Sequence, residues 1–324
     1  MKLDVRACLA VLAAALPLAA ASAQSDYPSR PIRLIVPYPP GGPTDIIGRL
    51  TSEVLTKRLG QTVVVDNRGG AATAIGAEMA ARAPADGYTL LLSSETTFAV
   101  TPALRSKLAY HPERDFAPIS MLTTQPYVLA VTPALPVNSV TQLIAHAKAN
   151  PGKLSYGSAG LGSANHLAGE MFRHAAGIDT VHVPYKGNGP AITDLISGQI
   201  AYMVGSISSL YPHAVANKLR LVAIAAAKRS PTAPAVPTFA ESGLPGYQVN
   251  GWNGIVAPRG TPAAVVKKLN AEVVAGFNSP DMLERLRKQS IESAVGAPEQ
   301  MAQHIKTEFA RYSKLIKSIG LKVD

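Results

Sequence analysis

The chain has 324 residues, a formal net charge of +10 and a single cysteine, Cys8. A chain of this length suggests two domains, and its Lys and Arg residues are scattered, without basic runs or interleaved aromatics, which argues against a nucleic-acid-binding protein. Because no cysteine follows Cys8, a disulfide framework, a thiolate metal site and a cysteine nucleophile are excluded from the rest of the chain.

The first predicted element is an export signal over residues 1–23. Lys2 and Arg6 form a short basic start, an apolar stretch covers residues 7–20, and an Ala-Ser-Ala cleavage site ends at Ala23. We therefore expect cleavage after Ala23 and a freely diffusing, monomeric protein in the periplasm. The alternative is a buried N-terminal helix, which would explain neither the basic start nor the cleavage site.

The next segment predicts a strand, a turn and a helix in direct succession. An apolar strand over residues 32–36 is followed by a turn rich in proline and glycine, and a helical pattern begins near Thr44. Such a turn exposes unpaired N–H groups at the positive end of a helix dipole, which suits an anion such as a carboxylate. The alternative is a rigid turn with a polar helix cap. The candidate binding residues are Tyr38, Gly41, Gly42, Pro43, Thr44 and Asp45.

Strands and helices alternate along the remaining chain. The further candidate strands are 63–66, 88–92, 128–131, 181–183, 201–204, 221–225 and 255–257. Residues typical of helix starts and ends lie between them: Ser139, Ser163, Gly177, Pro190, Gly198 and Pro262. The alternation predicts an α/β fold with mainly parallel sheets flanked by helices.

Two changes in composition predict crossings between two lobes. They lie near residues 120–132 and 240–257. The first lobe would then be discontinuous, with residues 24–124 plus 247–324, and the second would comprise residues 125–246. Two extended crossings between α/β lobes are typical of a hinged protein that binds its ligand in a cleft.

Further candidate binding residues lie near the carboxyl ends of predicted strands, where open α/β sheets bind ligands. After the strand at 88–92 come hydroxyls and one acid: Ser93, Ser94, Glu95 and Thr97. A glycine-rich loop before a helix contains Ser158, Ala159, Gly160, Ser163 and His166. Two more strands are followed by Lys186, Gly205 and Ser206.

Several of these residues also have a structural interpretation. The segment 93–97 can form a helix cap with a solvated acid, His166 can be a structural hydrogen-bond partner, and Lys186 can be solvated. Trp252 fits packing at a crossing better than stacking on a ligand. The histidines and acids are not spaced as in a metal-binding motif, so we expect no metal and no cofactor. The sequence also shows no catalytic nucleophile with a base and an orienting group, so we expect that the protein is not an enzyme.

Taken together, these motifs resemble those of Bug-type extracytoplasmic solute receptors, the TctC family of tripartite tricarboxylate transporters. The similarity extends in order from Tyr27 to the C-terminus. The stretches that carry it most clearly are 27–32, 39–45, 66–68, 85–91, 115–118, 158–160, 166–170, 182–187, 227–230 and 257–262.

The resemblance implies a two-lobed periplasmic binding protein of type II, joined by two crossing strands. It also implies a small organic acid as ligand, held by residues 38–45, 93–97 and 158–166, and delivery to a two-component membrane permease. This chain departs from the family pattern at Glu95, where relatives usually have Asn, and at Gly205 and Ser206, where many have Asp and Asn. From the resemblance we expect a mono- or dicarboxylate, and the departures leave open whether it also carries an amino or other donor group.

Two functions compete with transport. A periplasmic sensor that presents its closed form to a membrane signalling partner would use the same residues, so the sequence leaves this alternative open. A secreted hydrolase would need a catalytic set that the sequence lacks.

Overall fold

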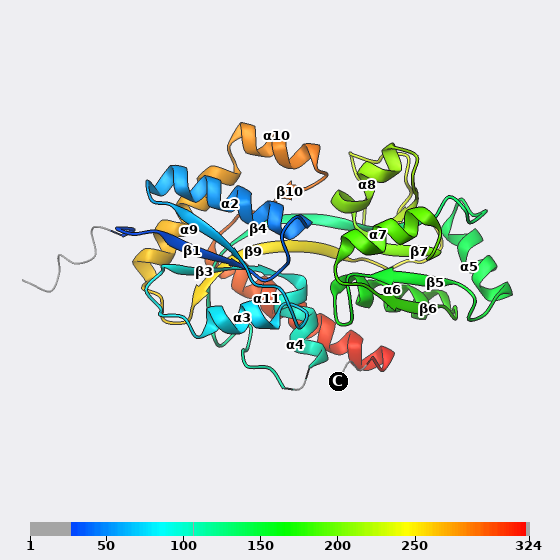
Figure 1. Cartoon of the computed structure of the whole chain (residues 1–324), viewed down its shortest axis with the longest axis horizontal. Coiled ribbons are helices and arrows are strands. Elements are labelled where there is room, and N and C mark those ends of the chain that lie inside the picture. The colour runs from blue at the N-terminus through cyan, green and yellow to red at the C-terminus, as the bar shows by residue number, and fades with distance from the viewer. Residues whose placement is uncertain (1–26, 106, 322–324) are drawn as a thin grey trace, which may run out of the picture.

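The computed structural model describes residues 27–105 and 107–321. The predicted export signal at 1–23 lies outside these residues. Ten strands form two mixed sheets that share strand β4 (Phe116–Val131), in the continuous order β2-β1-β3-β9-β4-β7-β5-β6. Figure 1 shows the two sheets side by side, each with its own helices, so the predicted two-lobed α/β class is confirmed.

The first lobe contains a parallel core bordered by antiparallel strands. Strand β1 pairs in parallel with β2 and β3, while β9 pairs antiparallel with β3 and with the first part of β4. A short strand β10 also pairs with β4. The strand bounds are β1 Ile32–Val36, β2 Val63–Asn67, β3 Thr89–Ser94, β9 Asn250–Pro258 and β10 Glu292–Ser293.

The second lobe repeats this arrangement. Strand β5 pairs in parallel with β6 and β7, and the last part of β4 pairs antiparallel with β7 and β8. The strand bounds are β5 Ser155–Ser158, β6 Val181–Pro184, β7 Tyr202–Ser206 and β8 Arg220–Ile224.

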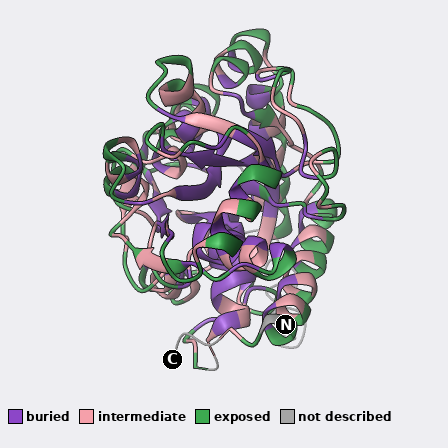
Figure 2. Ribbon diagram, turned by 90° about the vertical axis from the view of Figure 1, so that its right-hand side faces the viewer, coloured by how far each residue is buried: buried purple, intermediate pink, exposed green. Residues whose placement is uncertain are grey.

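Helices cover both faces of each sheet, because alternate strand residues point to opposite sides. In β1, Leu34 packs with α2 and α9, while Ile35 packs with α3 and α11. Figure 2 shows the buried residues concentrated in the strands and exposed residues on the surrounding helices. The helix bounds are α2 Pro43–Leu59, α3 Ala74–Ala81, η1 (a π-helical turn) Thr96–Val100, α4 Thr101–Leu104, α5 Val140–Ala149, α6 Ala164–Ala176, α7 Asn188–Ser197, α8 Ile207–Val215, α9 Ala263–Phe277, α10 Pro280–Lys288 and α11 Pro298–Ile319.

The predicted helix caps form as expected from their side chains. The hydroxyl of Ser139 accepts the Gln142 N–H at 3.1 Å at the start of α5, and Ser163 caps α6. Helices α6 and α7 end at Gly177 and Gly198, both in the left-handed conformation that glycine adopts without steric cost.

Strand β4 is much longer than the predicted strand 128–131. It begins at Phe116 and crosses from the first lobe to the second. Two prolines, Pro118 and Pro126, hide this strand from a sequence analysis, since proline cannot donate to a ladder. The pairing of β4 with β9 shifts register next to Pro118, as at a bulge.

Helix α11 spans both lobes behind the crossing strands (Figure 1). Its first half packs in the core of the first lobe through Met301 and Ile305. Its second half packs in the core of the second lobe through Tyr312 and Ile316. The lobes are therefore connected by the crossing segments and by this helix. No helix among the described residues is long and apolar enough to cross a membrane.

Candidate functional site

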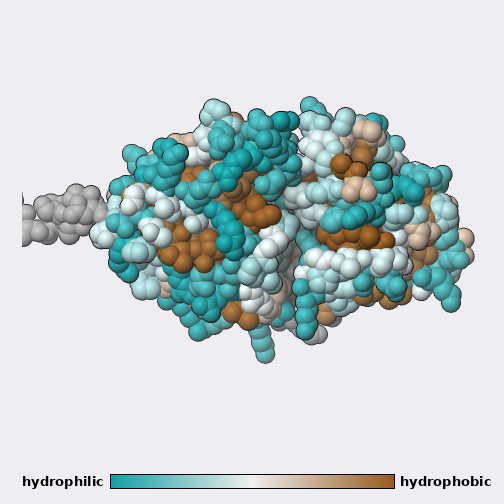
Figure 3. Space-filling view, turned by 45° about the horizontal axis from the view of Figure 1, so that its top comes forward, coloured by the Kyte–Doolittle hydropathy of each residue, from teal (hydrophilic) through white to brown (hydrophobic). Residues whose placement is uncertain are grey.

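A cavity of about 840 Å³ lies between the two lobes. Figure 3 shows a hollow between the two halves of the molecule. The first lobe contributes segments around β1–α2 and the start of η1, and the second contributes the segments before α6, α7 and α8. The crossing strands form its floor. The lining residues are 37–44, 46, 70–73, 95–96, 159–161, 163, 186–190, 206, 208–209, 212–213 and 251–253, with Gln125, Tyr127, Asn165, Ile192 and Gln289.

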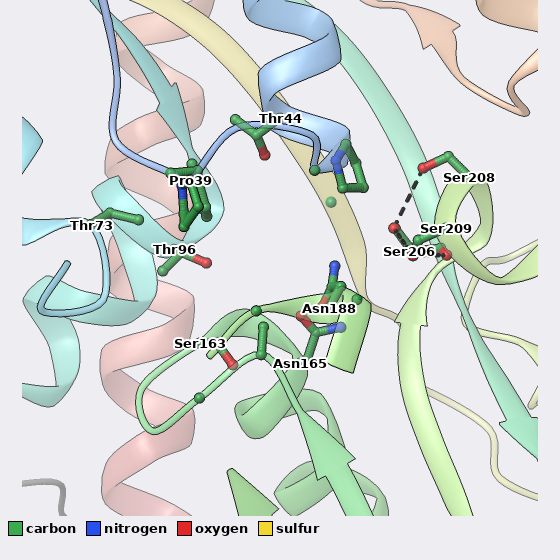
Figure 4. A pocket seen from close by; sticks show the side chains of 18 of the residues that line it. Pro39, Thr44, Thr73, Thr96, Ser163, Asn165, Asn188, Ser206, Ser208 and Ser209 are labelled. Atoms are coloured by element: carbon green, nitrogen blue, oxygen red, sulfur yellow. Dashed lines mark hydrogen bonds between the residues drawn. The ribbon is translucent and has the colours of Figure 1, made fainter. Parts of the chain in front are cut away.

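Helix N-termini from both lobes face this cavity. Helices α2, α7 and α8 begin there, and in none of the three does the N-cap side chain accept a hydrogen bond from a first-turn backbone N–H. The first-turn N–H groups of a helix have no partner inside the helix, so they attract an anion. In Figure 4 Thr44 at the start of α2 lies across the cavity from Asn188 of α7 and Ser206 before α8.

The first loop is shaped by Asp45, which points away from the cavity. Its carboxylate accepts hydrogen bonds from the Gly41 N–H, from Asn67 and from Arg49, each at 2.9 Å. Burial alone would raise the pKa of Asp45, but these donors together lower it below its ordinary value. Asp45 therefore fixes the loop, while Tyr38, Gly41, Gly42, Pro43 and Thr44 line the cavity.

Three of the four residues expected after the third strand do not line the cavity. Strand β3 continues to Ser94, two residues beyond its predicted end, so Ser93 and Ser94 pair with β9 inside the sheet. The Ser94 hydroxyl bonds to the Tyr38 hydroxyl at 2.7 Å and to the Thr97 hydroxyl at 3.1 Å. These buried hydroxyls position the Tyr38 ring, which itself lines the cavity.

Glu95 is the fourth residue, and it does line the cavity. Its side chain accepts hydrogen bonds from the Tyr127 hydroxyl at 2.7 Å and from the backbone N–H of Trp252 at 3.1 Å. Burial raises the pKa of Glu95 against the opposing effect of these two donors. Glu95 thus links the end of β3 to both crossing strands.

In the second lobe the glycine-rich loop is held from behind by two stacked histidines. The Nδ1 atom of His166 accepts the Gly162 N–H at 3.2 Å, and the Nε2 atom of His182 lies 2.7 Å from the Ser158 hydroxyl. The two rings stack with their centroids 4.1 Å apart. Ser158 and His166 support the loop from outside the cavity, whereas Ala159, Gly160 and Ser163 line it.

Of the remaining candidates in the second lobe, two line the cavity and one does not. Lys186 and Ser206 line the cavity. Gly205 lies in β7, which ends two residues later than predicted, and a Cβ there would approach the Asn165 amide nitrogen to 3.0 Å. Gly205 therefore leaves room for Asn165, which lines the cavity in its place.

Thr96 and Asn165, within the expected segments 93–97 and 158–166, line the cavity, but three other lining residues escaped the sequence analysis: Thr73, Gln125 and Asn253. They follow no motif of their own. Residues 71–73 adopt left-handed backbone conformations that sequence patterns do not reveal in Ala or Thr. Thr96 accepts the Ala164 N–H of α6 at 3.3 Å, which is a hydrogen bond between lobes. Among the described residues no group of three His, Cys, Asp or Glu side chains could hold a metal ion.

Two α/β lobes around a cleft lined by helix N-termini define a protein of the periplasmic binding class. The sequence profile of the TctC family, described as "Tripartite tricarboxylate transporter family receptor", matches residues 47–321. The chain belongs to this family, as its motifs predicted. The family is a class of solute receptors and not of enzymes.

Curated relatives match over nearly the whole chain. A Pseudomonas sp. protein from the tcbD-tcbE intergenic region is 41% identical over 322 residues, which are 98% of this chain and 96% of that protein. The protein BugT of Bordetella pertussis is 36% identical over 318 residues, which are 98% of this chain and 98% of that protein.

Solved structures share the fold at similar identity. An R. palustris protein with adipate superposes with a TM-score of 0.88 at 37% identity, covering 91% of this chain and 99% of that one. MatC from Rhodopseudomonas palustris with bound malate gives a TM-score of 0.84 at 34% identity, covering 90% of this chain and all of that one.

Proposed function

We propose that this protein is a periplasmic receptor that captures a small organic carboxylate in the cavity between its lobes and delivers it to a tripartite tricarboxylate-type permease. The observation that carries this proposal is the convergence of three N-termini, of α2, α7 and α8, from opposite lobes on one cavity. A carboxylate there would receive hydrogen bonds from both sides.

The mechanism we propose is hinge closure. A ligand first binds one lobe, the other lobe adds its donors, and closure buries the ligand. The lobes we propose to move are residues 24–124 plus 247–324 and residues 125–246, with the hinge in the crossing segments. The relatives solved with adipate and malate support a ligand of this chemical class. Periplasmic localisation and delivery by a monomer follow from the same proposal.

A thermal-shift screen tests the proposal directly. Mono- and dicarboxylates, with adipate and malate among them, are added to the purified mature protein. A ligand that binds only the folded state stabilises it by about 2.7 kcal/mol at about 100 times its Kd. We expect at least one carboxylate to raise the melting temperature in a saturable way, while the matching amides and alcohols do not. Equal shifts with the uncharged analogues, or none with any acid, would contradict the proposal.

A further inference from the structure

The cavity floor differs chemically from the cavity walls. The floor consists of Glu95, Gln125, Gly251 and Asn253. In the antiparallel pairing of β4 with β9, Gln125 lies opposite Gly251, and alternate residues of a strand share a face, so Gln125, Gly251 and Asn253 point to one side. A Cβ built on Gly251 would lie 3.5 Å from an oxygen of Glu95 and 3.6 Å from the Cγ of Gln125. The floor residues are therefore close neighbours.

Two floor side chains are buried without a hydrogen-bond partner for their oxygen. Gln125 is 6% exposed and Asn253 is 5% exposed, and both amide oxygens lack a partner within the part of the chain that the structure describes. Leaving a buried polar atom unsatisfied costs roughly 1–3 kcal/mol. Both oxygens are closed to solvent, so a donor group of a ligand would relieve this cost only if the side chains turned toward the cavity on binding.

The charges of the cavity are also separated. Glu95 is the one acid and Lys186 the one lysine or arginine among the described residues that line it. One Glu95 oxygen accepts from the Tyr127 hydroxyl and the other from the backbone N–H of Trp252, and an ionised carboxylate has room for about four hydrogen bonds. The walls offer donors from helix N-termini and hydroxyls, whereas the floor offers acceptors and a negative charge.

We propose that the ligand is an amino carboxylate, with its carboxylate at the helix N-termini and its ammonium group on the floor, and that Glu95 determines this specificity. This inference rests on the proposed receptor function. A plain dicarboxylate that reached the floor would place a second negative charge beside Glu95, which is unfavourable unless one of the two takes up a proton.

The surroundings of Glu95 set the expected pH dependence. The titratable groups that face it are the phenols of Tyr38, Tyr127 and Tyr312 and the carboxylate of Glu308, which is paired with Arg311 on α11. An ammonium group needs ionised Glu95, so affinity for an amino carboxylate should fall as pH falls through the raised pKa of Glu95. A plain dicarboxylate should show the opposite trend, because protonation removes the repulsion.

Matched pairs of ligands test this inference by titration calorimetry. The pairs are adipate with 2-aminoadipate, glutarate with glutamate, and succinate with aspartate, each measured on the wild type and on Glu95→Gln. Glutamine can accept the Trp252 N–H and donate to the Tyr127 hydroxyl oxygen, so the variant keeps both contacts and should melt at the wild-type temperature. Glu78→Gln is the control, because Glu78 on α3 pairs with Arg82 and does not line the cavity.

In the wild type we expect the amino member of the best-binding pair to bind at least about tenfold more tightly. Glu95→Gln should abolish or reverse that preference, and Glu78→Gln should keep it. If plain dicarboxylates bind as tightly and Glu95→Gln leaves the ranking unchanged, the inference fails while the receptor function stands. If no member of the three pairs binds the wild type, the inference fails, and the proposed function fails with it if the carboxylate screen is also negative.

Discussion

At the scale of single residues, the site depends on small groups that leave the helix N-termini accessible. Gly42 and Gly189 lie at the starts of α2 and α7 in opposite lobes, and a Cβ on either would meet no atom within 4 Å. Neither has a positive φ, so a larger residue fits the backbone. The space that such a side chain would fill is the cavity itself.

Gly42→Leu and Gly189→Leu should therefore each weaken carboxylate binding by at least about tenfold, because the new side chain blocks the approach to the N–H groups. Melting temperatures should stay near that of the wild type. Titration calorimetry with the best carboxylate of the screen measures the first effect. Ala145→Leu, on the exposed face of α5, is the matched control. Wild-type affinity in both glycine variants would show that the ligand binds elsewhere.

Sequence patterns predicted cavity-lining residues better in the turn before a helix than at the ends of strands. Five of the six residues chosen in the first loop line the cavity, and the sixth, Asp45, does not line it but holds that loop through the Gly41 N–H. Ser93, Ser94 and Gly205 were placed in loops but lie in strands, because apolar patterning does not show where a strand of small polar residues ends. Gln125 and Asn253 come into the site only through strand pairing, which no local pattern reveals.

At the scale of elements, the loop before α6 depends on the pair of stacked histidines. The Nδ1 atom of His166 must carry no proton to accept the Gly162 N–H. A second proton would give either ring a positive charge that faces the other ring, with 4.1 Å between their centroids. Burial, and then the charge on His166, lower the pKa of His182 from 6.5 to about 4. The folded state therefore resists a proton that the unfolded chain accepts.

The free energy of unfolding should consequently decrease as pH falls from about 6.5 to about 4, because the unfolded state binds more protons over this range. Above about 6.5 this contribution is fully present. Urea denaturation at several pH values measures the slope of the free energy of unfolding against pH. His182→Gln keeps a hydrogen-bonding group near Ser158 and should flatten that slope, whereas His146→Gln on α5 should not. An unchanged slope in His182→Gln would assign the acid sensitivity to other groups.

At the scale of the whole molecule, the two lobes are joined by strand β4, by the segment before β9 and by helix α11. Strand β4 pairs in both sheets, Val249 just before β9 bonds to Ala225 and Tyr127, and α11 packs in both cores (Figure 1). The α/β class could be predicted from the alternation of strands and helices, and the two lobes from the chain length and two changes in composition. The mixed character of the sheets could not, because the antiparallel pairs of β4 join segments that are far apart in the sequence.

Closure on a ligand should make the molecule more compact. In small-angle X-ray scattering we expect the radius of gyration of the wild type to decrease when a saturating carboxylate is added, because the second lobe moves onto the bound ligand. Gly42→Leu at the same ligand concentration should show a smaller decrease, because less of this variant is bound. A wild-type radius that does not change on saturation would contradict hinge closure.

The crystal structure of the wild type with the tightest-binding carboxylate of the screen is the most direct test of a site shared by two lobes. We predict carboxylate oxygens within about 3 Å of first-turn N–H groups of α2 and of donors at the start of α7 or α8. A ligand that contacts one lobe alone, or that lies outside the cavity between the lobes, would contradict this account.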